Sequence, residues 1–239
     1  MSSQEPIKML LKATADLQES SDYSDLTITC GTDVYRVHKA IVCSQSEFFR
    51  LACRTGVDPK GDFKEGKTGV VDIPARNTKD GLEEVDWDMD AEDPKAVKLM
   101  IHYLYHLDYL EVETAKVKAD PSPGVSKDYT ANDGILIYHA MMYAMGDKYG
   151  IYGLKALARE KFQEAWKFTA AGLVKAIKIA YASTMESDIG LCEIIINNLH
   201  SNVRNGLTTW MQMTEIDQCV KELPDLSYAL LRKQLGLSG

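Results

Sequence analysis

The sequence lacks any apolar run long enough to cross a membrane or to form the core of a signal peptide. Its longest apolar stretch, residues 134–146, is interrupted by Tyr138 and His139. That stretch falls short of the roughly 18 residues that a spanning helix requires, and the N-terminal segment has no apolar core of its own. We therefore expect a protein that is neither secreted nor embedded in a membrane.

Cysteine is scarce, and its spacing fits neither a disulfide framework nor a zinc finger. The 239 residues include 5 cysteines, an odd number, and none belongs to a CxxC pair. Such usage is typical of reduced thiols. We expect the cytosol or the nucleus as the compartment, with no bound metal or cofactor. The cysteines are Cys30, Cys43, Cys53, Cys192 and Cys219.

Basic residues are outnumbered, with 27 lysines and arginines against 35 acidic residues and a net charge of -8. An acidic chain repels nucleic-acid phosphate unless it concentrates a basic face, and no run of Lys and Arg interleaved with aromatic residues occurs. Direct nucleic-acid binding is therefore not expected. The 45% of hydrophobic residues allow one large domain, or one domain with a helical appendage, whose core needs no disulfide or metal.

The first third of the chain mixes helical and strand periodicity. Residues 6–19 have apolar positions at helical spacing and predict an amphipathic helix. Residues 25–37 alternate polar with apolar on both sides of a Gly31 turn, which predicts a β-hairpin. Residues 38–54 predict two short helices, the second capped by a serine at position 44 or 46.

A loop and a brief strand follow. Residues 55–69 are rich in Gly, Lys and Asp and predict a loop, and residues 70–73 predict a third strand. Residues 83–93 hold seven acids without one Lys or Arg, which is typical of a solvated surface insertion. We expect a helix over 94–106 and an edge strand over 109–112.

Only helices are expected after a linker at residues 113–131, whose centre is rich in proline and glycine. Each expected helix begins at a capping residue or a proline, or continues the periodicity of the one before it. Gly150 is a natural stop for the first of them. The expected helices cover residues 132–149, 154–166, 169–183, 188–203, 209–222 and 224–235.

These motifs in this order resemble the BTB (POZ) domain over residues 7 to about 165. The set consists of Ser24–Ile28, Val37–Val42, Ser44-x-Ser46, Phe48–Phe49, Leu104–Tyr105 and, later, Asp147–Tyr149. Each motif is short, and the resemblance rests on their common order and spacing. The run from Phe48 to Cys53, followed by Phe63–Gly66 and Val71–Pro74, is similar to fungal members of the family.

The resemblance implies an α+β fold, with a short mixed sheet flanked by helices and an all-helical extension similar to the BACK extension behind it. We expect an N-terminal dimerisation helix at residues 1–21, the BTB/POZ domain at 22–166 and the helical extension at 167–239. In the family that first helix packs across a two-fold axis, so the resemblance implies a homodimer. The interface residues would be Ile7, Leu10, Leu11 and Leu17.

Phe63 and Glu65 lie in the loop where cullin-binding BTB proteins carry a hydrophobic-x-Glu motif. In such proteins the apolar residue fills a pocket on the cullin and the Glu makes a contact at its rim. The resemblance therefore implies a cullin site at Phe63 and Glu65. The alternative, a loop phenylalanine that packs on its own domain, stays open at this point.

No constellation of residues predicts an enzyme. His102 and His106 have metal-ligand spacing, but their helical positions oppose the apolar stripe and favour surface or interface histidines. His38 and a nearby cysteine imitate a nucleophile pair without an orienting third group. The glycines at 146, 150 and 153 follow a helix and not a strand, so helix ends explain them better than a dinucleotide loop does.

We therefore expect a non-enzymatic, homodimeric interaction module that presents an unidentified substrate or regulatory protein to a cullin-RING ubiquitin ligase. The alternative is a self-assembly scaffold, or a module of transcriptional regulation, without cullin contact. An enzyme is disfavoured because no acid–base or nucleophile group converges.

Overall fold

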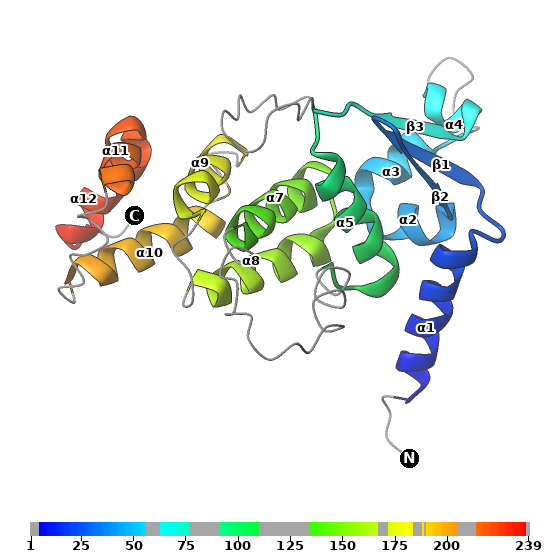
Figure 1. The fold of residues 1–239 in the computed structure, drawn as a ribbon, viewed down its shortest axis with the longest axis horizontal. Helices are drawn as coiled ribbons and strands as arrows, with labels where there is room; N and C mark the ends of the chain where they lie inside the picture. Colours follow the sequence, from blue (N-terminus) through cyan, green and yellow to red (C-terminus); the bar gives the residue numbers. More distant parts are fainter. Residues whose placement is uncertain are drawn as a thin grey trace, which may run out of the picture. The chain divides into compact units, whose positions relative to one another are not determined.

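The structure is a computed structural model that describes residues 5–55, 63–76, 91–109, 134–166, 172–183, 188, 190–204 and 214–237 (Figure 1). The chain divides into two compact units. The first comprises Met1–Ser126 with Met145–Leu157, and the second comprises Lys127–Ala144 with Ala158–Gly239. The expected domain boundaries at residues 21 and 166 stay predictions.

A three-stranded mixed sheet lies in the first unit, in the order β2-β1-β3. β1 (Leu26–Cys30) pairs antiparallel with β2 (Asp33–Val37) and parallel with β3 (Val70–Ile73). Cys30 faces Asp33 in the register, so two residues make the turn between β1 and β2. The first of them is Gly31 at φ +59°, a conformation that glycine adopts without steric cost. The expected hairpin and third strand are confirmed.

Helices flank this sheet within the same unit. Their bounds are α1 (Glu5–Ser20), α2 (Lys39–Gln45), α3 (Glu47–Ala52), α4 (Lys64–Thr68) and α5 (Pro94–His106), together with the end of α7 (Ile135–Lys148) and the start of α8 (Tyr152–Trp166). α5 carries the largest buried face of the unit, and the alternate residues of β1 are buried as well. The α+β fold expected from the sequence is confirmed.

α4 corrects one expectation, since residues 64–68 form a helical turn and not an open loop. Gly69 ends this turn in the left-handed conformation at φ +67°, and its N–H donates to the carbonyl of Glu65 at 2.9 Å. The glycine that made the segment look like a loop is thus the C-cap of a short helix.

The end of the acidic run also differs from the expected solvated insertion. The Glu92 carboxylate pairs with Lys148 at 2.7 Å, and its side chain is only 13% exposed. The Asp93 side chain accepts the N–H of Lys95 and caps α5, while Pro94 occupies its first turn. The start of helix α5 stabilises the Asp93 carboxylate, and the opposite charge of Lys148 stabilises Glu92. Residues 83–90 lie outside the described residues.

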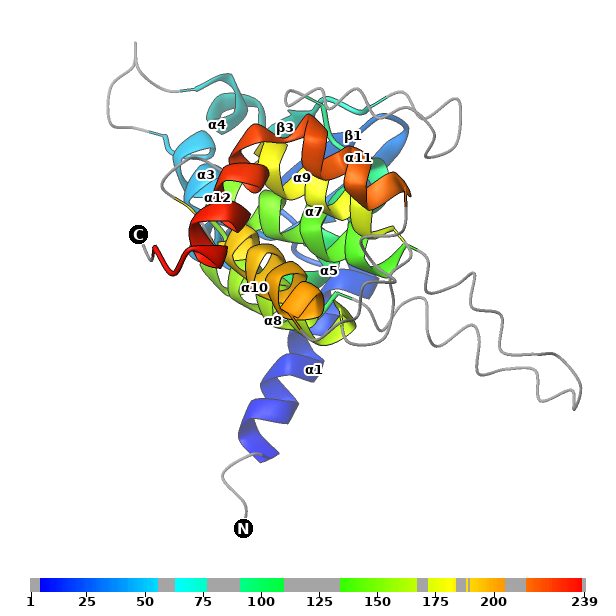
Figure 2. The same cartoon turned by 90° about the vertical axis from the view of Figure 1, so that its left-hand side faces the viewer.

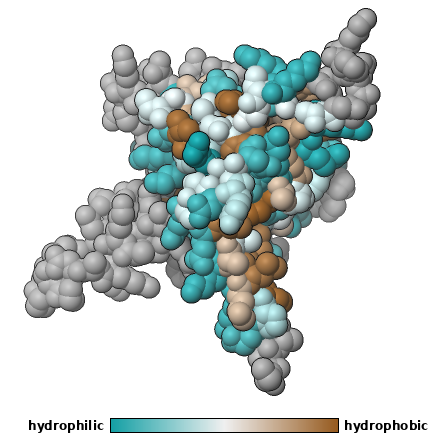
Figure 3. Space-filling view, turned by 90° about the vertical axis from the view of Figure 1, so that its right-hand side faces the viewer, coloured by the Kyte–Doolittle hydropathy of each residue, from teal (hydrophilic) through white to brown (hydrophobic). Residues whose placement is uncertain are grey.

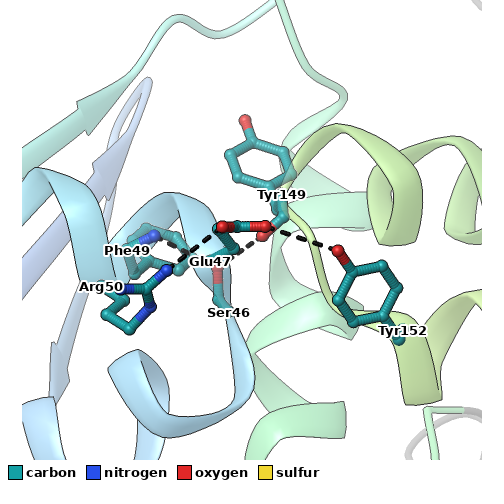
Figure 4. Close-up of polar contacts among 6 residues, drawn as sticks. All are labelled: Ser46, Glu47, Phe49, Arg50, Tyr149 and Tyr152. Atoms are coloured by element: carbon teal, nitrogen blue, oxygen red, sulfur yellow. Dashed lines mark hydrogen bonds and ion pairs between the residues drawn. The ribbon is translucent and has the colours of Figure 1, made fainter.

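A clamp of backbone and hydroxyl groups joins α3 to the turn between α7 and α8 (Figure 4). Ser46 donates from Oγ to the Tyr149 carbonyl at 2.6 Å and accepts the Phe49 N–H at 3.2 Å. The Glu47 N–H donates to the Gly150 carbonyl at 3.3 Å. Behind these bonds the Phe49 and Tyr149 rings stack at 5.7 Å. Of the two serines predicted as the cap, Ser46 is therefore the one that caps α3, and it also links two distant parts of the chain.

The described part of the second unit consists of helices, as the expected extension requires (Figure 2). α10 packs on α9 and α12, and α11 packs on α9 and α12. An ion pair between Lys178 and Glu222, at 2.9 Å, joins α9 to α11. The bounds are α9 (Leu173–Ser183), α10 (Gly190–Arg204), α11 (Thr214–Glu222) and α12 (Pro224–Gln234).

Two expected features fall outside the described residues. They are the linker at 113–131 and the edge strand at 109–112, of which only Tyr109 is described. No helix among the described residues is both long and apolar enough to cross a membrane.

Gly150 offers a test of the clamp. A Cβ at this position would lie 2.8 Å from the Cβ of Glu47, and its φ of +60° disfavours any side chain. Gly150→Ala should lower the free energy of unfolding by about 2–4 kcal/mol, because backbone strain adds to overpacking. Chemical denaturation measures the loss.

Gly69→Ala is the matched control for this prediction. Gly69 has a similar φ of +67°, but the nearest atom to its added Cβ is 3.9 Å away. Its substitution should cost only the backbone strain of about 1–2 kcal/mol. Equal losses for the two variants would show that the contact with Glu47 contributes nothing.

Candidate protein-interaction surfaces

α1 presents an apolar face that its own unit covers only in part. Ile7 and Leu10 are 60% and 66% exposed, whereas Leu11 and Leu17 are half-buried. None of the residues of this helix is fully buried. The apolar colour runs along the projecting turns of the helix in Figure 3. The four residues expected at a dimer interface therefore divide into an exposed pair and a partly covered pair.

The C-terminal half of α1 is held on α5. Thr14 donates from Oγ1 to the Tyr105 carbonyl at 2.8 Å, and the His106 ring nitrogen Nε2 lies 3.2 Å from Gln18 Oε1. These contacts fix the direction of the helix while its first turns extend beyond the unit (Figures 1 and 2). The exposed pair, Ile7 and Leu10, is thus presented on a helix anchored at its other end.

A second exposed apolar surface lies on α3 and the start of α8, and we call it the α3 surface. It consists of Phe48, Leu51 and Tyr152, which are 41%, 42% and 73% exposed. The Tyr152 hydroxyl donates to Glu47 at 3.4 Å, and Arg50 pairs with the same carboxylate at 3.1 Å (Figure 4). The apolar side chains are therefore bordered by the ion pair between Glu47 and Arg50.

Phe63 and Glu65 lie at the start of α4, next to the end of α3. A Cβ on Gly66 would meet the Arg54 carbonyl at 2.8 Å, which shows how closely α4 approaches the residues after α3. Phe63 precedes the helix in extended conformation and is 59% exposed, and Glu65 is half-buried. A phenylalanine in this position offers most of its ring to solvent or to a partner. Its role in cullin binding stays a prediction.

The sequence pattern did not single out the α3 surface. In the sequence, Phe48 and Leu51 are apolar residues of a predicted helix. Phe49, beside Phe48, is fully buried in the structure. The sequence does not tell which of two adjacent phenylalanines is buried, because this depends on how the helix packs against its neighbours. The pair Phe48 and Leu51, three residues apart, was the only available signal.

His38 has a structural role and no catalytic geometry. Its Nδ1 and its backbone N–H both meet the Tyr105 hydroxyl, at 2.8 Å and 2.9 Å, and its Nε2 lies 2.6 Å from the Asp22 carbonyl. A carbonyl can only accept, so Nε2 carries the proton and the Tyr105 hydroxyl donates to Nδ1. Both ring nitrogens are engaged. Burial raises the pKa of Tyr105 to about 12.

The two histidines of α5 stack on each other, with ring centroids 3.8 Å apart. Burial, and then the neighbouring His106, lower the pKa of His102 from 6.5 to about 4. The pair lies on the side of α5 where Gln18 of α1 meets His106. Among the described residues, no group of three or more His, Cys, Asp or Glu could hold a metal ion.

The family model of the BTB/POZ domain matches residues 14–119. This part of the chain is therefore a BTB/POZ domain, which is a protein-interaction domain and not a member of an enzyme family. No curated protein matches the chain. The similarity to fungal members stays a prediction.

The lowered pKa of His102 predicts a loss of stability in acid. Between pH 6.5 and about 4 the unfolded chain binds a proton at this residue while the folded chain does not. The free energy of unfolding should therefore fall as the pH falls through this window and should change no further from this residue below about pH 4. Thermal unfolding as a function of pH measures the effect.

His102→Asn should reduce the acid sensitivity in this window, since asparagine does not titrate. The comparison with the wild type at each pH separates His102 from the carboxylates, which both proteins share. An identical slope for both proteins would contradict the prediction.

Proposed function

We propose that this protein is a non-enzymatic, homodimeric BTB module that presents other proteins to a cullin-RING ubiquitin ligase. The carrying observation is the exposed Phe63, which directly precedes α4. The BTB/POZ domain supports the interaction role in general. The cullin, the dimer and the absence of enzymatic activity are parts of the proposal.

The homodimer is supported by the exposed face of α1. Burying a leucine-sized side chain that is now exposed contributes roughly 1.5–3 kcal/mol, and Ile7, Met9 and Leu10 are each exposed by more than half. A second copy of the same helix offers an apolar cover through a two-fold axis, in which each face is self-complementary. The exposed turns of α1 would then be the first part of the chain to gain from dimerisation.

The cullin contact is supported by the combination of Phe63 with the α3 surface. Apolar anchors with a charged rim are the usual composition of an interface hot spot. Here Phe63, Leu51 and Phe48 are exposed and would supply the apolar part, and Glu65, two residues after Phe63, would supply the charged part. Both groups belong to the same unit of the chain. The N-terminal repeat of a cullin would contact Phe63 and the α3 surface at the same time.

The alternative function is a scaffold for self-assembly or transcriptional regulation. It shares the dimer and lacks the cullin contact, so binding to purified cullin separates the two. Under either function we place the protein in the cytosol or the nucleus. The odd number and wide spacing of the 5 cysteines support a reducing compartment.

The dimer is tested by Leu10→Glu. A carboxylate on the exposed face of α1 should dissociate the dimer, since it places a charge where apolar burial is expected. Sedimentation at micromolar concentration should give a dimer for the wild type and a monomer for the variant. A wild-type monomer at high micromolar concentration would contradict the dimer.

Lys12→Glu is the control for the same helix. Lys12 is exposed and lies about 160° around the helix from Leu10. This variant changes the charge by two units, where Leu10→Glu changes it by one. A dimer that survives Lys12→Glu and is lost with Leu10→Glu depends on the apolar face and not on the charge of the helix.

The cullin contact is tested by Phe63→Ala. Truncation of an anchor in a desolvated pocket should cost about 2 kcal/mol or more, which is roughly a thirtyfold weakening of binding. Glu65→Ala should cost less, because a rim residue stays partly hydrated. Calorimetry with the purified cullin N-terminal domain measures both affinities.

Lys64→Ala, which changes the exposed middle residue of the motif, should leave the affinity within twofold of the wild type. Thermal unfolding of all three variants should match the wild type, since more than half of the Phe63 side chain is exposed. The absence of wild-type binding, or equal binding by Phe63→Ala, would overturn the cullin contact and favour the scaffold.

A further inference from the structure

Two cysteines on neighbouring helices converge on a single carbonyl group. Cys43 lies in the last turn of α2, and Cys53 is the residue that ends α3. The Cys43 thiol donates to the Phe49 carbonyl with Sγ 3.5 Å from the oxygen, and the Cys53 N–H donates to the same oxygen at 2.9 Å. The two side chains also lie close enough to shift each other's pKa.

Neither cysteine is closed off from solvent, since both are half-buried. Cys30 and Cys219, in contrast, are buried in the core of their units. A cysteine that only fills space in a core needs neither a neighbouring thiol nor access to solvent. Cys43 and Cys53 have both, which is the requirement for chemistry between two sulfurs.

We propose that Cys43 and Cys53 form a dithiol modification site that glutathione disulfide converts into an intrachain disulfide between α2 and the end of α3. Cys53 loses its proton, attacks one sulfur of glutathione disulfide and expels a glutathione thiolate, which takes up a proton. Cys43 then loses its proton, attacks Cys53 Sγ in the mixed disulfide and expels the second glutathione. The protein loses two hydrogen atoms, and one glutathione disulfide becomes two glutathione thiols.

The surroundings of the thiols disfavour their thiolate forms. Burial raises the pKa of Cys43 to about 12 and raises the pKa of Cys53 as well. The thiolate is the attacking species in thiol–disulfide exchange, so exchange with glutathione disulfide is slow at neutral pH. The neighbouring Cys43 and Lys39 act in the opposite direction on the pKa of Cys53, so we take Cys53 as the first nucleophile.

The site can be tested on the full chain by peptide mapping. The protein is equilibrated in buffers of increasing ratio of glutathione disulfide to glutathione, alkylated with N-ethylmaleimide and digested with trypsin. Cleavage after Arg50 separates the peptide 40–50, which holds Cys43, from the peptide 51–54, which holds Cys53. A linked pair, lighter by two hydrogen atoms than its parts and split by dithiothreitol, is the expected product.

The folded chain should reach half-conversion at a ratio at least about tenfold lower than the urea-unfolded chain, because the fold holds the sulfurs together. Cys43→Ser and Cys53→Ser should each abolish the linked pair, whereas Cys192→Ser, a change in the second unit, should preserve it. Alkylation of both cysteines at every ratio would overturn the proposal. Equal conversion of the folded and unfolded chains would overturn it as well.

Discussion

The junction between α3 and the turn after α7 is the constraint on which the first unit depends. The Ser46 hydroxyl both caps α3 and donates to the Tyr149 carbonyl, more than a hundred residues away in the sequence. Neither bond faces solvent, so the loss of the hydroxyl would leave the buried Phe49 N–H unsatisfied, whereas the Tyr149 carbonyl would keep only its longer bond from the Phe48 N–H at 3.4 Å. Gly150 lets the two backbones approach, since any side chain there would collide with Glu47.

This junction decides which residues of α3 are available to a partner. With Phe49 stacked on Tyr149, the neighbouring Phe48 and Leu51 are left on the outside, and Tyr152 is held beside them through Glu47. The short helix α4 lies against the end of α3 and carries Phe63. The surface is therefore assembled from segments that are distant in the sequence and that each contact α3.

A second hydrogen-bond network fixes the start of α2, the helix that precedes α3. The Tyr105 hydroxyl on α5 bonds His38 at the start of α2, and His38 in turn reaches the Asp22 carbonyl. The carbonyl of the same Tyr105 accepts the Thr14 hydroxyl of α1. One residue of α5 therefore orients both α1, with its exposed apolar face, and the start of α2, the helix that precedes α3.

The sequence by itself determined the periodic elements, because local spacing records which face of a helix or strand is apolar. The hairpin, α1, α5 and the C-terminal helices were predicted on this basis, and the residue types left the cap of α3 to Ser44 or Ser46. Tertiary structure alone decided the pairing of Glu92 with Lys148 and the exposure of Phe48 beside the buried Phe49. It also brought Cys43 to Cys53. Each of these depends on a partner distant in sequence or on how one helix docks against another, and periodicity within a single segment carries neither kind of information.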